Sequence, residues 1–297
     1  MGRPLNEVPF VSTDSWKTLD LITEASQFLA TREIENPRLE TELLLAAALD
    51  LRRIDLYLQF ERILNETEVE LFRSYVSERL RGRPVQYITG EAGFRLLDLE
   101  VTPAVLIPRP ETELLVEHAL TLVPDDQSTR VLDLCCGSGA VAIAMATEAA
   151  SVQVRGSDLS PAALAVARRN CERHQVADRL QLVCGDLLTP FAGHACFDLI
   201  LSNPPYINSS EIETLQAEVR DHEPLLALDG GADGLDVLRR IIDAAPGHLV
   251  AGGHLLVEVG YTQAHKVAEL MQAADLEPSV HEDLADIPRI VVGRKTN

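Results

Sequence analysis

Residues 130–140 read RVLDLCCGSGA, an apolar run that leads directly into two closely spaced glycines. The apolar run predicts a buried strand, and the small residues after it predict a tight loop that opens a helix. Gly137 and Gly139 let the backbone approach a ligand closely, and the helix presents its N-terminal N–H groups to the same point. The stretch therefore predicts a cofactor-binding loop between a strand and a helix.

Strands and helices alternate from this loop to the end of the chain. Strands are predicted near 130–135, 152–158, 180–185, 197–202, 254–259 and 289–294, and helices near 139–149, 161–174, 234–250 and 262–274. Such alternation predicts an α/β fold with a doubly wound, mainly parallel, Rossmann-like sheet. Ligands are expected at the carboxyl ends of its strands.

The glycine loop taken by itself suits more than one adenosine cofactor. Gly137-x-Gly139-x-x-Ala142 matches the short form of the dinucleotide fingerprint. Asp158 ends the second strand about 20 residues further on, where an acid would accept hydrogen bonds from ribose hydroxyls. The loop alone therefore supports NAD or another adenosine-containing cofactor.

Acidic residues after the first three strands favour S-adenosylmethionine over NAD. Asp133 lies at the end of the first strand, Asp158 ends the second, and Asp186 with Leu187 follows the third. A carboxylate beside the glycines suits a cationic methionyl group and is poorly suited to a pyrophosphate. Since the fourth strand ends in a turn suited to an amine, residues 203–206, the whole set predicts a methyltransferase.

The turn Asn203-Pro204-Pro205-Tyr206 follows the apolar run 197–202. Two consecutive prolines have a fixed φ and no N–H group, so they end the strand in a rigid turn. The turn presents acceptors in one direction, which suits an NH₂ group with two protons to donate. We expect the Asn203 side-chain carbonyl and the Pro204 backbone carbonyl to accept both protons of an amide. Tyr206 would then pack against the target side chain.

The chain is predicted to have four regions. These are a flexible lead-in over 1–13, a helical bundle over 14–83, a β-hairpin linker over 84–108 and a methyltransferase domain over 109–297. Apolar residues at helical spacing and a capping box at Asn65 and Glu68 predict the bundle. Two short apolar runs, 85–88 and 94–101, separated by glycines, predict the hairpin.

Composition excludes several classes of protein. A formal net charge of −20 argues against a protein whose affinity comes from nucleic-acid phosphates. No apolar stretch approaches the roughly 20 residues of a membrane span, and the N-terminus lacks the apolar core of a signal peptide. We therefore expect a cytoplasmic protein with no membrane partner. The 5 cysteines show no CxxC spacing, so no metal site or disulfide framework is expected.

The sequence resembles the HemK/PrmC family of protein-(glutamine-N(5)) methyltransferases from Gly82 to about Gly293. The resemblance is carried by residues 82–90 (GRPVQYITG), 106–113 (LIPRPETE), 133–139, 158–161, 197–207 and 223–235. It implies a class I S-adenosylmethionine-dependent methyltransferase whose substrate is the glutamine of the Gly-Gly-Gln motif in peptide chain release factors. It also implies that the N-terminal bundle helps to dock the release factor.

The resemblance also implies roles for particular residues. The expected cofactor contacts are Asp133, Gly137, Ser138, Gly139, Asp158 (ribose), Asp186 and Leu187 (adenine) and Asn203. The expected catalytic and substrate contacts are Asn203, Pro204, Pro205 and Tyr206, with Phe94 and Arg109 lining the pocket. Two stretches depart from the family pattern: Cys135-Cys136 in the cofactor loop, where a positive φ would be strained, and Ala285–Arg289 before the last strand.

Other functions are consistent with parts of the sequence. A glutamine of a ribosomal large-subunit protein would suit the same turn. So would the exocyclic amine of adenine in a nucleic acid, although that enzyme would have to extrude its target base, and the net charge of −20 counts against it. A non-enzymatic nucleotide-sensing or docking protein would require loss of a key group, whereas Asn203, Asp158 and the glycines are all present.

Overall fold

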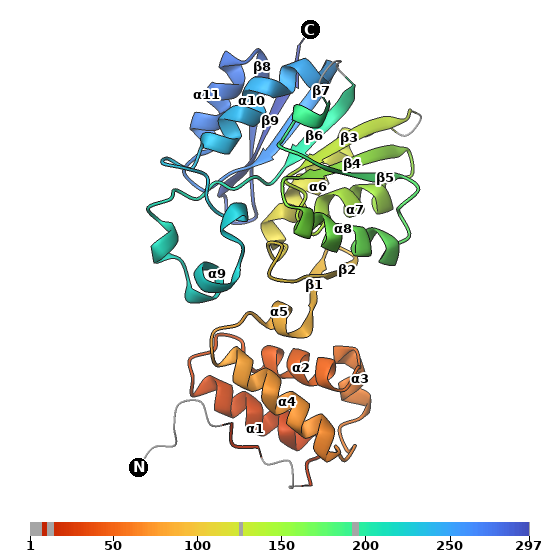
Figure 1. The fold of residues 1–297 in the computed structure, drawn as a ribbon, viewed down its shortest axis with the longest axis vertical. Helices are drawn as coiled ribbons and strands as arrows, with labels where there is room; N and C mark the ends of the chain where they lie inside the picture. Colours follow the sequence, from red (N-terminus) through yellow and green to blue (C-terminus); the bar gives the residue numbers. More distant parts are fainter. Residues whose placement is uncertain (1–7, 11–14, 125–126, 192–195, 297) are drawn as a thin grey trace. The chain divides into compact units, whose positions relative to one another are not determined.

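The computed structural model describes residues 8–10, 15–124, 127–191 and 196–296. The chain divides into two compact units. Unit 1 comprises Met1–Gly90 and Ala217–His222, and unit 2 comprises Glu91–Gln216 and Glu223–Asn297. Figure 1 labels the helices and strands of both units.

Unit 1 is a bundle of helices, as predicted. Its helices are α1 (Thr18–Ala30), α2 (Pro37–Ala48), α3 (Arg53–Leu58), α4 (Glu66–Arg79), α5 (Val85–Thr89) and α9 (Ala217–His222). The predicted capping box is present: Asn65 accepts from the Glu68 backbone, and the Glu68 side chain accepts from the Asn65 backbone. Leu21, Leu44 and Phe72 are fully buried and pack together in the core of the bundle.

Helix α9 joins unit 1 although it comes from far along the chain. Arg79 of α4 has an exposed fraction of 5%, and its guanidinium pairs with Glu40 at 2.6 Å and with Glu218 of α9 at 2.5 Å. A buried guanidinium needs such carboxylate partners to offset its lost hydration. The ion pairs therefore explain why this short helix belongs to the bundle.

The first residues differ from the flexible lead-in predicted over 1–13. Val8 and Phe10 are buried in the core of unit 1. The Phe10 ring meets the rings of Trp16 and Phe28 edge-on, at centroid distances of 6.1 and 5.8 Å. Burial of an aromatic ring offsets the entropy lost on ordering the chain, so the prediction is wrong for these two residues. The rest of the segment, except the proline between them, lies outside the described residues.

The β-hairpin linker predicted over 84–108 is not a separate region, because the boundary between the units falls after Gly90. The strand predicted over 85–88 is wrong, since these residues belong to helix α5. Gly90 ends that helix in the left-handed conformation (φ 79°), the common C-cap of a helix. Four apolar-rich residues are too few to distinguish a strand from one turn of helix.

A β-hairpin does form in unit 2, and its turn and second strand fall inside the single strand predicted over 94–101. Its strands are β1 (Glu91–Phe94) and β2 (Leu97–Glu100), which pair antiparallel. Arg95 in the turn has a left-handed φ of 52°. Its backbone N–H donates to the Glu113 carboxylate at 2.8 Å. This contact between distant residues supports a turn that the local apolar pattern could not reveal.

Unit 2 is built on a seven-stranded sheet with the strand order β5-β4-β3-β6-β7-β9-β8 (Figure 1). The strands are β3 (Thr129–Leu134), β4 (Val152–Asp158), β5 (Leu180–Cys184), β6 (Phe197–Ser202), β7 (Leu249–Glu258), β8 (Leu276–Glu282) and β9 (Pro288–Lys295). Strands β3 to β7 pair in parallel, and β9 runs antiparallel between β7 and β8. The predicted doubly wound, mainly parallel sheet is confirmed.

The helices of unit 2 include all four that the alternation predicts. They are α6 (Glu113–Thr121), α7 (Ala140–Glu148), α8 (Pro161–Arg173), α10 (Asp236–His248) and α11 (Ala264–Ala273). Short 3₁₀ turns occupy Pro110–Thr112, Thr189–Phe191, Ile212–Thr214 and Leu225–Ala227. Strand β8 is absent from the prediction because it is an edge strand with mostly exposed residues and a proline, Pro278.

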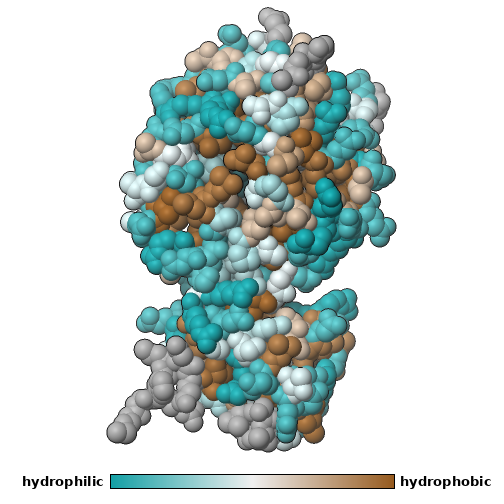
Figure 2. Space-filling view, viewed as in Figure 1, coloured by the Kyte–Doolittle hydropathy of each residue, from teal (hydrophilic) through white to brown (hydrophobic). Residues whose placement is uncertain are grey.

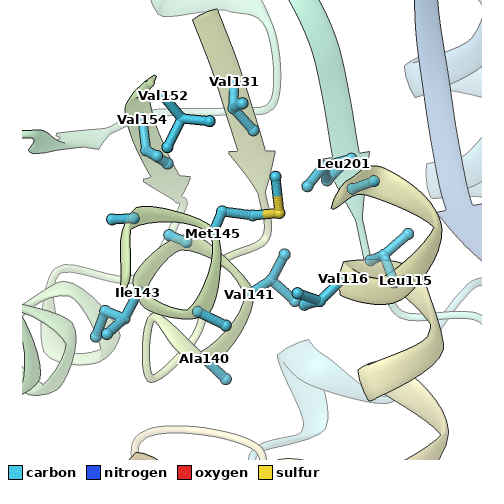
Figure 3. Packing of buried hydrophobic residues seen from close by; sticks show 14 of the residues in the cluster. Leu115, Val116, Val131, Ala140, Val141, Ile143, Met145, Val152, Val154 and Leu201 are labelled. Atoms are coloured by element: carbon cyan, nitrogen blue, oxygen red, sulfur yellow. The ribbon is translucent and has the colours of Figure 1, made fainter. Parts of the chain in front are cut away.

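Apolar side chains cover both faces of the sheet. Neighbouring residues of β3, such as Val131 and Leu132, belong to different cores because successive side chains of a strand point to opposite faces. One core includes residues of α6 and α7, and the other includes residues of α10 and α11. In Figure 3 the fully buried Met145 of α7 points toward Val131 and Leu201 of the sheet.

The strand order reverses at β3, which has β4 on one side and β6 on the other. In open α/β sheets ligands bind at such a point, outside the carboxyl ends of the strands. Leu134 at the end of β3 pairs with Ser202 at the end of β6. The glycine loop and the proline turn therefore begin side by side.

Polar side chains cover much of the face drawn in Figure 2, and apolar side chains gather in patches between them, including on unit 2. Within the described ranges, none of the helices combines the length and the apolar character needed to cross a membrane.

Leu115→Ala tests the core shown in Figure 3. Leu115 is fully buried, so the substitution removes apolar contacts and leaves a cavity; the free energy of unfolding should fall by about 2–5 kcal/mol. Urea unfolding followed by circular dichroism measures the change. Leu96→Ala is the matched control, because Leu96 is 91% exposed and its loss should cost about 0.5 kcal/mol or less. Equal losses in the two variants would contradict the packing.

Candidate active site

Two adjoining hollows lie at the carboxyl ends of the parallel strands of unit 2. The predicted cofactor residues that line the large hollow, about 350 Å³ in volume, are Gly137, Asp158, Asp186, Leu187 and Asn203. Those that line the small hollow, about 50 Å³ in volume, are Asp133, Gly137, Ser138 and Asn203. Gly137 and Asn203 line both hollows, so they mark the place where the two meet.

The loop after β3 begins at Cys135 in a left-handed conformation (φ 57°). The strain predicted for a side chain there is thus present, at about 1–2 kcal/mol. The loop closes where the Gly139 N–H donates to the Cys136 carbonyl at 2.7 Å. Gly139 has a φ of 84°, and a Cβ there would lie 3.1 Å from Ile143. Glycine at this position lets helix α7 begin directly after the loop.

Asp158 shapes the same loop from the end of β4. Its Oδ2 accepts from the Gly137 N–H at 2.9 Å, and its Oδ1 accepts from the Ser160 N–H at 2.8 Å. Burial raises the pKa of Asp158, and these backbone hydrogen bonds oppose the rise. Each carboxylate oxygen keeps a further lone pair, so Asp158 can hold the loop and accept from hydroxyl groups in the large hollow.

Asp133 is buried at the end of β3, with an exposed fraction of 2%. Its Oδ2 accepts from the Ala142 N–H of α7 at 3.1 Å. Burial, helped by the neighbouring charge of Asp158, raises the pKa of Asp133 to about 8. A cation in the small hollow would stabilise the charged form of this carboxyl.

The mouth of the large hollow carries a polar and an apolar side. Asp186 pairs there with Arg240 of α10 at 2.6 Å, and both side chains are exposed. Leu187 follows Asp186 with a positive φ of 49°. Leu226 lies on the lining and is 54% exposed. The mouth can therefore contact both polar edges and flat apolar groups.

The chain after the prolines is held by backbone contacts. The Ile207 N–H donates to the Leu228 carbonyl at 3.0 Å, and the Ile207 carbonyl accepts from the Gly230 N–H at 2.8 Å. The Gln263 Nε2 donates to the Tyr206 carbonyl at 2.9 Å. Gly230 approaches so closely that a Cβ on it would lie 2.8 Å from the Tyr206 Cα. These contacts fix the direction in which the proline turn faces.

Four side chains form a line of hydrogen bonds beside the turn. Asn203 Nδ2 donates to Thr112 Oγ1 at 2.9 Å, and Thr112 Oγ1 donates to Glu258 Oε2 at 2.6 Å. The Tyr206 hydroxyl donates to Glu258 Oε1 at 3.1 Å. Burial raises the pKa of Glu258, while both hydrogen bonds lower it. Burial also raises the pKa of Tyr206. With its nitrogen bound to Thr112, the Asn203 amide has its oxygen left as an acceptor.

The residues predicted to contact the substrate are not all brought together. Asn203 and Pro205 line the large hollow, and Arg109 lines the small one while its guanidinium bonds to Glu223 at 2.5 Å. Phe94 has an exposed fraction of 1% and lies in the apolar core, and it is not among the described residues that line the hollows. The structure thus places this ring in the packing of unit 2 rather than in a wall of the site.

Comparison with known proteins agrees with this arrangement. Models described as PrmC N-terminal domain and Methyltransferase small domain match residues 20–90 and 110–231. The release factor glutamine methyltransferase of Geobacter sulfurreducens is 45% identical over 280 residues, which cover 94% of this chain and 97% of that protein. The chain belongs to the release factor glutamine methyltransferase family. The family member of Chlorobaculum tepidum is 41% identical over 282 residues, covering 92% of this chain and 96% of that protein.

A solved structure supports the fold of unit 2. A methyltransferase from Pyrococcus furiosus superimposes with a TM-score of 0.52 at 18% identity, covering 68% of this chain and 90% of that one. The predicted family and the predicted methyltransferase fold are both confirmed.

Several residues that shape the family's site in this chain escape sequence reasoning. Glu223 pairs with Arg109, Gln263 holds the Tyr206 carbonyl, and Thr112 and Glu258 bond to each other. Glu258 gave a usable signal as an acid at the end of a predicted strand, and Glu223 begins the quoted stretch 223–235. Thr112 lies within the quoted stretch 106–113, but its partners come from distant parts of the chain.

Asp133→Asn tests the buried carboxyl through its effect on stability. Because the folded-state pKa of Asp133 is raised from 3.8 to about 8, the contribution of this one group to the free energy of unfolding of wild type is greatest below about pH 4, falls as the pH rises to about 8 and is level above. Asparagine does not titrate, so the free energy of unfolding of the variant should gain on wild type by a few kcal/mol, or about 1.4 kcal/mol per pKa unit, between pH 5 and pH 8.

Urea unfolding at the two pH values measures this gain. The exposed Asp243 of α10 provides the control substitution Asp243→Asn. The difference in free energy of unfolding between this variant and wild type should be the same at both pH values. A difference between Asp133→Asn and wild type that stays constant with pH would contradict the raised pKa.

Proposed function

We infer that this chain transfers a methyl group from S-adenosylmethionine to the side-chain amide nitrogen of a protein glutamine. The substrate we propose is the glutamine of the Gly-Gly-Gln motif of peptide chain release factors, the class of protein named by the relatives. The observation that carries this proposal is that Asn203 lines both hollows while its amide nitrogen is bound to Thr112, which leaves its oxygen as an acceptor. As the relatives act on translation factors by name, we expect the chain to work in the cytoplasm.

The residues of the hollows fit S-adenosylmethionine. Three acidic side chains, Asp133, Asp158 and Asp186, line the hollows at the ends of successive strands; of these, Asp186 pairs with Arg240, and a bound cation would favour the charged form of Asp133. Such a lining attracts a cation and repels a pyrophosphate. We propose that Asp133 faces the methionyl end, Asp158 accepts from the ribose hydroxyls, and Asp186 with Leu187 contacts the adenine. Gly137 and Ser138 would bring the backbone close to the methionyl group.

When bound, the cofactor supplies an electrophilic methyl group on a positively charged sulfur. The chain has to hold the target nitrogen in line with it, because an amide nitrogen is a poor nucleophile. We propose that the Asn203 Oδ1 and the Pro204 carbonyl accept the two N–H protons of the glutamine. These acceptors are fixed in advance by the rigid turn and stabilise the positive charge that develops on the nitrogen. The methylated amide cation is very acidic, so it loses one of its two N–H protons to solvent without a strong base. Pro205 and Tyr206 would contact the rest of the glutamine side chain.

One experiment tests the substrate against the alternatives. The protein is incubated with methyl-labelled S-adenosylmethionine together with purified release factors, ribosomal large-subunit proteins and DNA, and the labelled residue is mapped by mass spectrometry. Label on the glutamine of the Gly-Gly-Gln motif is expected. Label confined to a ribosomal-protein glutamine or to DNA adenine would overturn the proposed substrate.

Asn203→Ala should lower the rate of glutamine methylation by about 10²–10³-fold, the loss expected for one preorganised hydrogen-bonding partner. Binding of S-adenosylmethionine should change little, because the cofactor is held mainly by the strand-end acids and the glycine loop. Mass spectrometry of the product gives the rate, and calorimetry gives the affinity. Asn208→Ala is the control, since the hydrogen bonds described for the Asn208 side chain come from Ser210, beyond the turn. Unchanged activity of Asn203→Ala would rule out the proposed grip.

Asp158→Ala should weaken S-adenosylmethionine binding, because it removes the ribose acceptor and frees the Gly137 N–H that organises the loop. The loss of a charged hydrogen-bonding partner is worth about 1.5–3 kcal/mol, roughly a 10- to 100-fold rise in Kd. Isothermal titration calorimetry measures it. Asp178→Ala, at an exposed turn, is the control and should bind like wild type. Equal affinity in Asp158→Ala and wild type would refute the role of Asp158.

A further inference from the structure

We propose that Thr112 and Glu258 are positioning residues that lock the Asn203 side-chain amide with its oxygen, not its NH₂ group, toward the target glutamine. The inference rests on the proposed function, because it explains how the acceptor at Asn203 is selected. It adds two residues from other elements to the turn: Thr112 from the 3₁₀ turn Pro110–Thr112 and Glu258 from the end of β7.

An asparagine side chain has two orientations of almost equal shape that differ by exchange of oxygen and nitrogen. In one, Asn203 offers the target an acceptor. In the other it offers two N–H donors to a glutamine NH₂ group that is itself a donor, so the two would repel. Binding of the amide therefore depends on a neighbour that discriminates between the two orientations.

The Thr112 hydroxyl discriminates because it has a single proton to donate. An ionised carboxylate only accepts, so the contact of 2.6 Å to Glu258 Oε2 uses that proton. The hydroxyl can then only accept from its other partner, Asn203, whose nearest polar atom lies at 2.9 Å. That atom must be the amide nitrogen, which leaves the amide oxygen of Asn203, a residue that lines both hollows, as an acceptor.

The carboxylate that sets this direction is itself held from both sides. Glu258 is 1% exposed, and its second oxygen accepts from the Tyr206 hydroxyl at 3.1 Å. Burial and the charge of Glu111 raise the pKa of Glu258, and the hydrogen bonds from Thr112 and Tyr206, with the charge of Arg289, oppose that rise and favour the ionised form. A protonated carboxyl would instead donate to Thr112 and allow its hydroxyl to turn toward Asn203. The productive orientation therefore belongs to the ionised form of Glu258.

The same network links two ends of the proline turn. Asn203 begins the turn and Tyr206 ends it, and both reach the one carboxylate of Glu258, the first through Thr112. Apart from orienting the amide, Glu258 thus fixes the turn against β7. Thr112 is buried, with an exposed fraction of 5%, so solvent offers its hydroxyl little alternative to these two partners.

Two substitutions of Thr112 separate the hydroxyl from the shape of the side chain. Thr112→Val keeps the shape and removes the hydroxyl, so kcat for release-factor methylation should fall about 10- to 100-fold, the value of one charge-assisted hydrogen bond. Thr112→Ser keeps the hydroxyl and should restore kcat to within a few-fold of wild type. Calorimetry should give the same S-adenosylmethionine affinity for both variants, and thermal unfolding shows that each is folded.

A double-mutant cycle tests whether Thr112 acts through Asn203. In the Asn203→Ala background, Thr112→Val should have no further effect on kcat, since there is no amide left to orient. Independent, multiplying losses would overturn the inference, as would full activity of Thr112→Val. Wild type lacking any glutamine methylation would instead refute the proposed function itself, so the two failures are told apart.

Discussion

Pro204 and Pro205 have no backbone N–H to donate, so strand β6 cannot continue its ladder past Asn203. The polypeptide has to leave the sheet there, at the edge where β3 also ends and the glycine loop begins. The sheet register thus sets the proline turn beside the glycine loop before any side chain of the site is considered. The other residues of the site either fix this turn by hydrogen bonds or place acidic side chains beside it.

The electrostatic character of the two hollows follows from the positions of the acidic residues at the strand ends. Asp133 is buried and Asp158 is half-buried at the ends of neighbouring strands, where hydration is reduced and the charged forms are disfavoured, which raises both pKa values. Backbone N–H groups of the loop and of helix α7 recover part of that loss. A cationic ligand can offset the remaining loss of hydration free energy, because it stabilises the charged carboxylates. In this way the architecture that orders the loop also selects the charge of its ligand.

Much of unit 2 could be predicted from the sequence, because buried parallel strands and amphipathic helices leave a local signal. The stretch 130–140 predicts a strand, a loop and a helix, and β3 with α7 is what forms. Edge strand β8 leaves no such signal, since its residues are mostly exposed. The helix α5 escaped for a different reason, because one turn of apolar residues also fits a strand.

The sequence predicts those site residues that directly follow a strand. It does not predict those whose role depends on a contact with a residue far away in the sequence. Asn203 and Asp158 stand out in the sequence, and both line the large hollow. Thr112 and Glu258 lie far apart in the sequence and meet only in the folded unit, so no local pattern reveals their contact. Phe94 was predicted from the family resemblance to line the pocket, but its ring is buried in the apolar core of unit 2.

The most direct test of the central claim is a crystal structure of the full chain with S-adenosylhomocysteine and a release factor. The glutamine amide nitrogen is expected within hydrogen-bond distance of both the Asn203 side chain and the Pro204 carbonyl, with Thr112 behind the asparagine. A glutamine bound with its nitrogen away from these two groups would contradict the claim that the proline turn holds the reacting amide.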